Sequence, residues 1–299
     1  MDRFNKESVK QNLKEYFGIE VEKIELIGKG YDSEAYLIDD EYIFKFNINT
    51  NQKKSYYKEK SILDFLNNNL KLDIEIPKIE YFYTSKEISI MGYKKIDGIF
   101  FSPQIYNEMS LEQKENLIKD ISTFLQELHN LDYTEINQFK IDNKANCLEE
   151  LEILKQTIYD EFSDIEKQYI EKFFKKLEST KIFDDKKCLC HNDFSCNHLL
   201  LDKNYRLKGI IDWGDSGIID EYCDFIYLLE DSEEEIGNEF GLEILKQYEN
   251  LNISKAQEYV DITEEYYPIE TIIYGIRNNR KDFIEKGRNI INERCKNVI

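Results

Sequence analysis

Apolar and polar residues alternate in several short runs within the first hundred positions of the chain. A period of two is typical of β-strands whose two faces meet different surroundings. The runs are Val21 to Ile27, Ala35 to Ile38, Tyr42 to Phe46 and Glu87 to Tyr93. Between the last two runs, residues 55–69 place apolar side chains at the spacing of one helix face. The N-terminal region is therefore predicted to be an antiparallel β-sheet with one main helix.

The rest of the chain shows mainly the spacing of amphipathic helices. Ser110 and Gln113 have the form of a capping box, and apolar residues then recur at helical spacing from Leu117 to Leu128. Further helices are predicted at residues 149–162, 164–177, 266–277 and 281–294. Apolar runs at 199–201 and 207–211 flank turn residues and predict a hairpin. The predicted fold class is α+β, with a large and mostly α-helical C-terminal part.

The composition indicates which classes of binding partner and which cellular compartment to expect. The chain has 299 residues, with 60 Asp and Glu against 40 Lys and Arg, and a formal net charge of -20. Such a field repels phosphate backbones, so we expect no nucleic-acid partner. The N-terminus lacks an apolar signal segment, and no stretch approaches about 18 uninterrupted apolar residues. We expect a cytoplasmic monomer without a membrane partner.

The six cysteines are too few for a disulfide scaffold in a chain of this length. Cys188 and Cys190 form a C-x-C pair, which is a spacing found at zinc sites. The sequence shows no second ligand pair to complete such a site. We therefore interpret the thiols as reduced and unligated.

One motif pair indicates phosphoryl-transfer chemistry. The segment from Cys190 to His198 contains an H-x-D arrangement, and Asp212-Trp213-Gly214-Asp215 follows the predicted hairpin. In protein kinases, H-R-D-x-x-x-x-N supplies a catalytic base and a metal ligand, and D-F-G supplies a second ligand. On this frame Asp193 is the candidate base, and His198 and Asp212 are the candidate magnesium ligands. A lone H-x-D arises by chance, but the spacing of the three parts is much more specific.

An independent series of residues upstream has the order that a nucleotide site requires. Gly28, Gly30 and Ser33 lie in a turn between two predicted strands, where a glycine-rich loop would cover phosphates. Lys45 follows in the next strand, and Glu59 lies in the first half of the predicted helix. A Lys45–Glu59 ion pair would hold the lysine toward the phosphates. Taken singly, a G-x-G turn marks ordinary hairpins and a Lys/Glu pair is usually solvated.

These motifs resemble those of the aminoglycoside phosphotransferases, and most closely the 2''-phosphotransferase branch. His191 to Ser195 and Ile210 to Asp215 match H-N-D-F-S and I-I-D-F-G-D, with Trp213 in place of Phe. The chain is also similar, almost end to end, to the kinase half of bifunctional acetyltransferase/phosphotransferases. The resemblance implies a bilobal protein-kinase-like fold. Residues 1–96 would form the nucleotide-binding lobe and hinge, and residues 97–299 the catalytic and aminoglycoside-binding lobe.

Departures from protein kinases agree with a small-molecule substrate. Asn192 replaces the arginine of the catalytic loop, His198 replaces the metal-binding asparagine, and no A-P-E segment follows. Ser195 either contacts the acceptor hydroxyl or Asp193, or tightens the loop as a turn residue. We include it among the candidate catalytic residues without choosing between these roles.

The resemblance also implies an acidic binding site for a cationic aminoglycoside. The carboxylates are Asp193, Asp215, Glu230, Glu234 and Glu235, with Tyr267 as a flat wall for a sugar ring just before a helix that starts at Pro268. The acidic run from Glu230 to Glu235 has a second interpretation, because acidic residues also favour the first turn of a helix. Both interpretations are compatible.

The donor nucleotide is expected where the two lobes meet. Tyr93 ends the fourth predicted strand as a gatekeeper, and the backbone of Lys94 and Ile96 would pair with the purine. In the resembling branch a bulky Tyr at this place goes with GTP, so we expect GTP as favoured donor, ATP as the weaker one, and Mg²⁺ as cofactor. Ordinary core packing is the alternative role for Tyr93.

The sequence thus predicts an aminoglycoside 2''-O-phosphotransferase that confers antibiotic resistance. Its expected acceptors are 4,6-disubstituted aminoglycosides such as kanamycin and gentamicin. One alternative is a kinase of another small cationic alcohol, such as choline or a macrolide. Another is a non-catalytic, kinase-shaped nucleotide-binding protein, against which the retention of Lys45, Glu59, Asp193, His198 and Asp212 argues.

Overall fold

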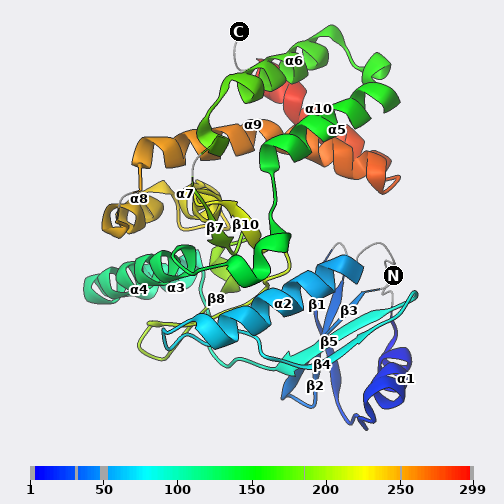
Figure 1. Ribbon diagram of the computed structural model, residues 1–299, viewed down its shortest axis with the longest axis vertical. Coiled ribbons are helices and arrows are strands. Elements are labelled where there is room, and N and C mark those ends of the chain that lie inside the picture. Colours follow the sequence, from blue (N-terminus) through cyan, green and yellow to red (C-terminus); the bar gives the residue numbers. More distant parts are fainter. Residues whose placement is uncertain (1–3, 31–32, 48–52, 185, 250, 297–299) are drawn as a thin grey trace.

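The N-terminal lobe is built on a twisted antiparallel sheet (Figure 1). A computed structural model describes residues 4–30, 33–47, 53–184, 186–249 and 251–296, so Tyr31 and Asp32 of the predicted glycine loop lie outside the described residues. The strands are β1 (Ile24–Lys29), β2 (Glu34–Ile38), β3 (Tyr42–Asn47), β4 (Ile79–Thr84) and β5 (Ser89–Lys94). Among the described residues they pair in the order β1-β2-β3-β5-β4.

Two helices cover opposite faces of this sheet. Helix α1 (Lys6–Phe17) contributes Val9 and Leu13 to a core with Phe44 and Phe46 of β3. Side chains alternate along a strand, so Lys45 points to the other face, where it meets Glu59 of α2 (Lys53–Asn69). The predicted sheet and main helix are confirmed.

Two details of the sheet differ from the sequence prediction. The first strand begins at Ile24 instead of Val21, because the backbone N–H groups of Glu22 and Lys23 donate to the Asp39 carboxylate rather than to a strand. Strand β4 escaped prediction because its side chains are nearly all half-buried, so no polar and apolar alternation marks it.

The chain passes from one lobe to the other between β5 and β6 (Ile99–Phe100). Strand β6 pairs with β8 (Leu199–Leu201), which pairs with β9 (Leu207–Ile210), so the predicted hairpin is confirmed. Strand β7 (Lys187–Cys190) pairs with β10 (Gly217–Asp220). The boundary after residue 96 stays a prediction, since α2 packs into the same hydrophobic core as the C-terminal helices.

Helices make up most of the C-terminal lobe, and the predicted fold class is confirmed. They are α3 (Pro103–Glu108), α4 (Leu111–His129), α5 (Asn143–Thr157), α6 (Asp164–Ser179), α7 (Ile226–Leu229), α8 (Asn238–Gln247), α9 (Ile253–Arg277) and α10 (Lys281–Lys296). The predicted capping box at Ser110 and Gln113 is present. Among the helices that the structure describes, none has the length and apolar character needed to cross a membrane.

Helix boundaries show where local capping overrides periodicity. Helix α5 begins at Asn143, earlier than predicted, because the Asp142 side chain accepts the N–H of Ala145. The acidic run 231–235 is not the first turn of a helix. Instead, the carboxylate of Asp231 accepts the N–H of Asn238, where α8 starts.

Helix α9 runs through Pro268, which the sequence suggested as the start of a shorter helix. A proline inside a helix leaves the carbonyl four residues earlier without its usual donor. Here that carbonyl belongs to Glu264, and the Arg294 guanidinium of α10 donates to it at 2.6 Å. The next carbonyl, of Glu265, accepts the Tyr169 hydroxyl at 2.7 Å. Neighbouring helices therefore keep α9 continuous.

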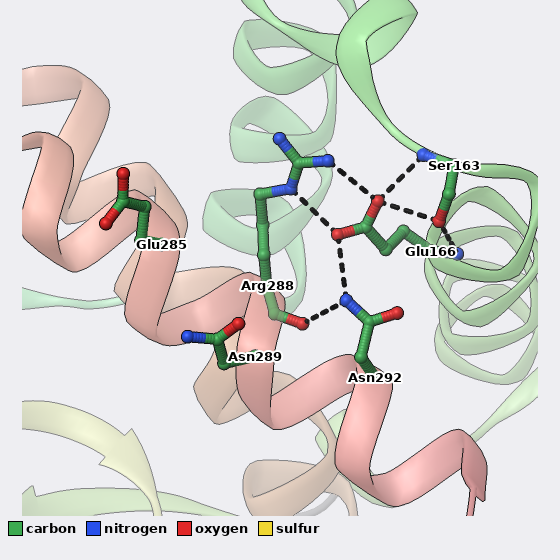
Figure 2. A pocket seen from close by; sticks show the side chains of 6 residues that line it. All are labelled: Ser163, Glu166, Glu285, Arg288, Asn289 and Asn292. Atoms are coloured by element: carbon green, nitrogen blue, oxygen red, sulfur yellow. Dashed lines mark hydrogen bonds and ion pairs between the residues drawn. The ribbon is translucent and has the colours of Figure 1, made fainter.

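A second polar contact ties α10 to α6 around a cavity of about 450 Å³ (Figure 2). Glu166 is buried and accepts hydrogen bonds from the Arg288 guanidinium at 2.8 and 3.0 Å, as well as from Ser163. Burial opposes the charged carboxylate, but Arg288 and Ser163 hold its pKa at about 2. Because the carboxylate is fully partnered, we interpret this cavity as part of the packing between the helices.

Candidate active site

The catalytic loop between β7 and β8 is anchored by a buried carboxylate. Asp224 accepts the backbone N–H groups of His191 at 3.0 Å and Asn192 at 2.6 Å. The His129 ring, which ends α4, lies 2.9 Å from the same carboxylate and 2.9 Å from the Tyr248 hydroxyl. Asn192 adopts a φ of 64°, a conformation that asparagine tolerates well. Asp224 thus fixes the loop backbone at two consecutive residues.

His191 has a structural role in this arrangement. Its Nε2 lies 2.9 Å from the carbonyl oxygen of Ile211, and its Nδ1 accepts the N–H of Asp193. This pairing assigns the proton to Nε2. Burial lowers the pKa of the ring, which also packs edge-on against Trp213. The neutral imidazole therefore links the catalytic loop to the segment that carries Asp212.

Asp193 projects from this loop as a half-buried carboxylate. Burial raises its pKa to about 6, although His198 opposes the rise. The carboxylates of Asp215 and Asp212 act in the same direction as burial, and the hydroxyl of Tyr227 lies beside the group and favours its charged form. A carboxylate with a raised pKa is a better proton acceptor than an exposed one, as a general base requires.

His198 and Asp212 face each other with the donor atoms that a cation would bind. Nδ1 of His198 lies 2.8 Å from the Asp193 carbonyl oxygen, so it carries the proton and leaves a lone pair on Nε2. That Nε2 is 3.7 Å from Oδ2 of Asp212. The Lys45 ammonium lowers the pKa of the Asp212 carboxyl to about 2, although burial of the carboxylate acts in the opposite direction. A nitrogen lone pair beside an ionised carboxylate fits a divalent cation between them.

Lys45 joins the two lobes at this point. Its ammonium is 3.1 Å from Glu59 of α2 and 2.7 Å from Asp212. Burial opposes the charge on the ammonium, but the two carboxylates outweigh it and hold the pKa of Lys45 above its ordinary value. The predicted Lys45–Glu59 pair is present, and Asp212 is a second partner that sequence reasoning did not give to the lysine.

The glycine loop leads into β2, where Ala35 pairs with Lys45 of β3. The N–H of Gly30 donates to the carbonyl of Ser33 at 2.9 Å, which closes the loop base, while Gly28 lies opposite Ala35. Tyr56 of α2, which the sequence analysis did not single out, lies close by. Its hydroxyl is buried beside the Ser33 side chain, at the base of the loop.

The predicted hinge residues lie at the end of β5. Tyr93 is only 5% exposed, and burial raises the pKa of its hydroxyl to about 12. The Lys94 side chain is exposed and pairs with Glu41. Ile96 is half-buried and lies against Gly209 of β9. Their contacts with a purine stay predictions.

The predicted substrate carboxylates lie on both sides of the catalytic loop. Asp215 is exposed, and its carbonyl accepts the Asn192 side chain at 3.3 Å. Glu235 is buried and accepts the N–H of Cys196, and burial raises its pKa to about 7. The carbonyl of Glu234 accepts the Cys196 thiol at 2.9 Å. Burial, with Glu264 and Glu234 nearby, also raises the pKa of Glu230.

Ser195 and Tyr267 make contacts that do not themselves indicate the roles predicted for them. The Ser195 hydroxyl donates to the Asn197 side chain and is 3.2 Å from Nδ1 of His198, so in this structure it serves the loop. Tyr267 lies within α9 and not before a helix, and its hydroxyl accepts the Lys286 ammonium at 3.0 Å. A direct part in catalysis for Ser195 and a sugar contact for Tyr267 stay predictions.

Sequence reasoning missed further residues of the site. The sequence analysis singled out neither Asp224, which anchors the catalytic loop, nor Tyr227, which lies beside Asp193. Glu264 approaches Glu230 from α9, and Glu270 of the same helix approaches Asp215. Glu264 and Glu270 are six positions apart, which is not the spacing of one helix face, so no periodic signal marked the last two. For Asp224 and Tyr227 no local pattern exists, because only the fold brings them under the loop.

The cysteines correct one premise of the sequence analysis. Cys223 lies within metal-ligand reach of Cys190, and Cys188 and Cys190 are 3.5 Å apart at their sulfurs, with His129 adjacent. A further thiol and an imidazole therefore do join the C-x-C pair. Both nitrogens of His129 already bond to Asp224 and Tyr248, however, and the cysteines are free thiols in the core. We interpret this cluster as packing behind the catalytic loop.

The assembled geometry can be compared with known proteins. The sequence profile described as "Phosphotransferase enzyme family" (APH) matches residues 23–259. The gentamicin complex of APH(2'')-IIa is similar at 28% identity with a TM-score of 0.85, over 97% of each chain. The streptomycin and ATP complex of the same enzyme gives 27% and 0.83, over 98% of this chain and 97% of that one.

A third similarity shows the shared fold alone. The GDP complex of aminoglycoside 2'-phosphotransferase-IIIa has 22% identity and a TM-score of 0.82, over 99% of this chain and 100% of that one. The profile match covers the glycine loop, Lys45 and the catalytic loop, and both Lys45 and His198 of the catalytic loop face Asp212. The chain therefore belongs to the phosphotransferase enzyme family.

Proposed function

We propose that the chain is an aminoglycoside 2''-O-phosphotransferase that confers antibiotic resistance. It transfers the γ-phosphate of GTP, or less readily of ATP, to the 2''-hydroxyl of 4,6-disubstituted aminoglycosides such as kanamycin and gentamicin. The observation that carries the proposal is the convergence of three groups between the lobes. Asp193 is a half-buried base, His198 and Asp212 form a pair suited to a cation, and Lys45 is held by Glu59.

The residues of the chain supply positioning and charge. Lys45 extends toward the donor phosphates, because Glu59 and Asp212 fix its ammonium from two sides. Asp193 orients the acceptor hydroxyl and takes its proton. Phosphoryl transfer has a loose transition state, so alignment of the hydroxyl contributes more than early proton removal. Mg²⁺, held by His198 and Asp212, would supply charge neutralisation at the phosphates.

Carboxylates near the catalytic loop and on α9 form the acceptor site in this proposal. Amine groups of the drug would pair with Asp215, Glu230, Glu234 and Glu235. Exposed pairs contribute about 0.2 to 1 kcal/mol each, whereas enclosed charge-assisted hydrogen bonds contribute about 1.5 to 3. The partly buried members, Glu230 and Glu235, should therefore dominate affinity. Gentamicin and streptomycin in complexes of APH(2'')-IIa support a drug of this class.

Tyr93 carries the donor preference. Its ring is buried at the end of β5, beside the segment that leads to the hinge. Replacing it with alanine opens space beside the purine, and we expect Tyr93→Ala to raise the ATP to GTP ratio of kcat/KM roughly tenfold. The Tyr93→Phe variant keeps the bulk and should keep the preference of the wild type. Equal ATP kinetics in wild type and Tyr93→Ala would rule this role out.

The regiochemistry needs its own experiment. Purified protein, kanamycin and Mg²⁺ would be incubated with GTP and ATP in competition, and the phosphorylated drug isolated. Phosphorus–proton coupling in the NMR spectrum then identifies the modified carbon. We expect coupling to the 2'' proton and GDP as the main released diphosphate. Coupling at another position would overturn the 2'' assignment, whereas the membership of the chain in the phosphotransferase enzyme family would still hold.

A further inference from the structure

A fully buried carboxylate lies at the base of the glycine loop, outside the catalytic machinery. Glu34 is the first residue of β2 and is 0% exposed. It lies opposite Lys29, the last residue of β1, so the two residues form the final pair of strand positions below the loop. Their side chains approach to 3.8 Å. A buried carboxylate is expensive unless donors surround it, so its partners show what it holds in place.

Two of its partners are Phe4 of the N-terminal segment and Tyr36 of its own strand. Oε2 of Glu34 accepts the backbone N–H of Phe4 at 3.2 Å and the Tyr36 hydroxyl at 2.7 Å. The same hydroxyl lies 3.1 Å from the carbonyl oxygen of Phe4. Glu34 therefore holds the Phe4 N–H, and the Tyr36 hydroxyl, whose one proton is shared between the Glu34 carboxylate and the Phe4 carbonyl, links the two residues just before α1 begins.

The attachment is on the face of the sheet opposite to the catalytic lysine. Glu34 pairs in register with Phe46, whose ring packs on Phe4 at 5.3 Å and edge-on against Tyr36 at 5.6 Å. Lys45 precedes Phe46 and so points to the other face. The N-terminal segment consequently supports β2 and β3 from behind, at the level where the glycine loop leaves the sheet.

We propose that Glu34 is a positioning residue that ties the base of the glycine loop to the N-terminal segment and so sets the affinity for the donor nucleotide. The inference rests on the proposed function only in taking the loop as the cover of the nucleotide phosphates. Fixing Glu34 from the N-terminal side fixes Lys29 and the Gly30–Ser33 closure in turn. A strand pair that is already fixed loses less conformational entropy when the nucleotide binds beside it.

The test compares Glu34→Gln and Tyr36→Phe with Glu25→Gln. The glutamine keeps the size of Glu34 but loses the charge and one acceptor oxygen, and the phenylalanine removes only the bridging hydroxyl. Glu25 is exposed on β1 and serves as the matched control. Loss of about one hydrogen bond should raise the nucleotide KM about three- to tenfold in the first two variants, with kcat and the drug KM little changed.

Hydrogen exchange of residues 28–36 provides a readout that needs no activity. We expect faster exchange in Glu34→Gln and Tyr36→Phe than in wild type and Glu25→Gln, with the rest of the sheet unaffected. If the wild type turned over no drug, the proposed function would fail, and the exchange would still decide whether Glu34 ties the loop. Unchanged exchange overturns the proposal. Faster exchange with an unchanged nucleotide KM in an active enzyme overturns it too, because the contact would then be structural only.

Discussion

The position of the ring proton decides the role of each histidine in the catalytic loop. The Nδ1 proton of His198 is committed to the Asp193 carbonyl, which leaves Nε2 facing Asp212 as a ligand. His191 has the reverse assignment and bonds the Ile211 carbonyl through Nε2. Two histidines in one loop thus differ in role because different backbone carbonyls select their tautomers. One is a structural link, and the other is a candidate ligand.

Glu235 allows a prediction on pH at the same scale. Burial raises the pKa of its carboxyl to about 7, so the group is protonated below that pH and anionic above it. Only the anion attracts an ammonium group of the drug. The kanamycin KM should therefore rise about three- to tenfold as the pH falls through 7. Glu235→Gln should lose this step while the nucleotide KM follows the wild type. Parallel pH profiles of wild type and variant would contradict the assignment.

Sequence reasoning reached the residues that occupy fixed places in a motif. Lys45 and Glu59 were correctly paired, and His198 and Asp212 were correctly brought together by the hairpin. Asp224 was missed because its role depends on β10 and the short helical turn after it lying under the catalytic loop. That kind of contact has no local signature. It arises from tertiary packing between residues 32 or 33 positions apart in the sequence.

Among whole elements, helix α9 shows how tertiary contacts override a local rule. A proline predicts a helix boundary, and Pro268 suggested one. Arg294 and Tyr169 instead satisfy carbonyls near the proline, so the helix continues for a full 25 residues. Gly287 of α10 allows the close approach, since a side chain there would meet the Pro268 carbonyl at 2.5 Å. The partner helices thus determine the length of α9.

The contact between α6 and α10 gives a stability prediction. Arg288→Ala removes the charged partner of buried Glu166 and leaves that carboxylate with Ser163 and Asn292. Breaking a fully buried pair costs about 3 to 5 kcal/mol, and the partial exposure of Arg288 reduces this to about 2 kcal/mol. Urea unfolding at neutral pH measures the change. Lys246→Ala, which breaks an exposed pair with Glu243, should stay within about 0.5 kcal/mol of wild type.

At the scale of the whole molecule, the charge of -20 creates a long-range field that favours cationic ligands. Charge spread over the molecule steers a ligand from a distance and does not require contact. The anionic donor must bind against the same field. Lys45 is a buried cation, paired with Glu59 and Asp212, that would meet the donor phosphates in the proposed function.

Ionic strength separates the two substrates. Raising NaCl from about 50 to about 300 mM shortens the screening length below 10 Å and weakens attraction of the drug. The kanamycin KM should rise several-fold, while the nucleotide KM stays level or falls because screening reduces its repulsion. Steady-state kinetics at fixed Mg²⁺ measures both. A kanamycin KM that does not respond to salt would show that the net charge has no part in acceptor binding.

The most direct measurement of the central claim is the mass of kanamycin after incubation with the protein, Mg²⁺ and GTP, for wild type and Asp193→Ala in parallel. Wild type should add one phosphate to the drug and release GDP in equal amount. The variant should be slower by about 10²- to 10⁴-fold with nucleotide affinity nearly intact, because only the base is lost. A drug mass unchanged by wild type with either nucleotide, or equal rates for both proteins, would contradict the account.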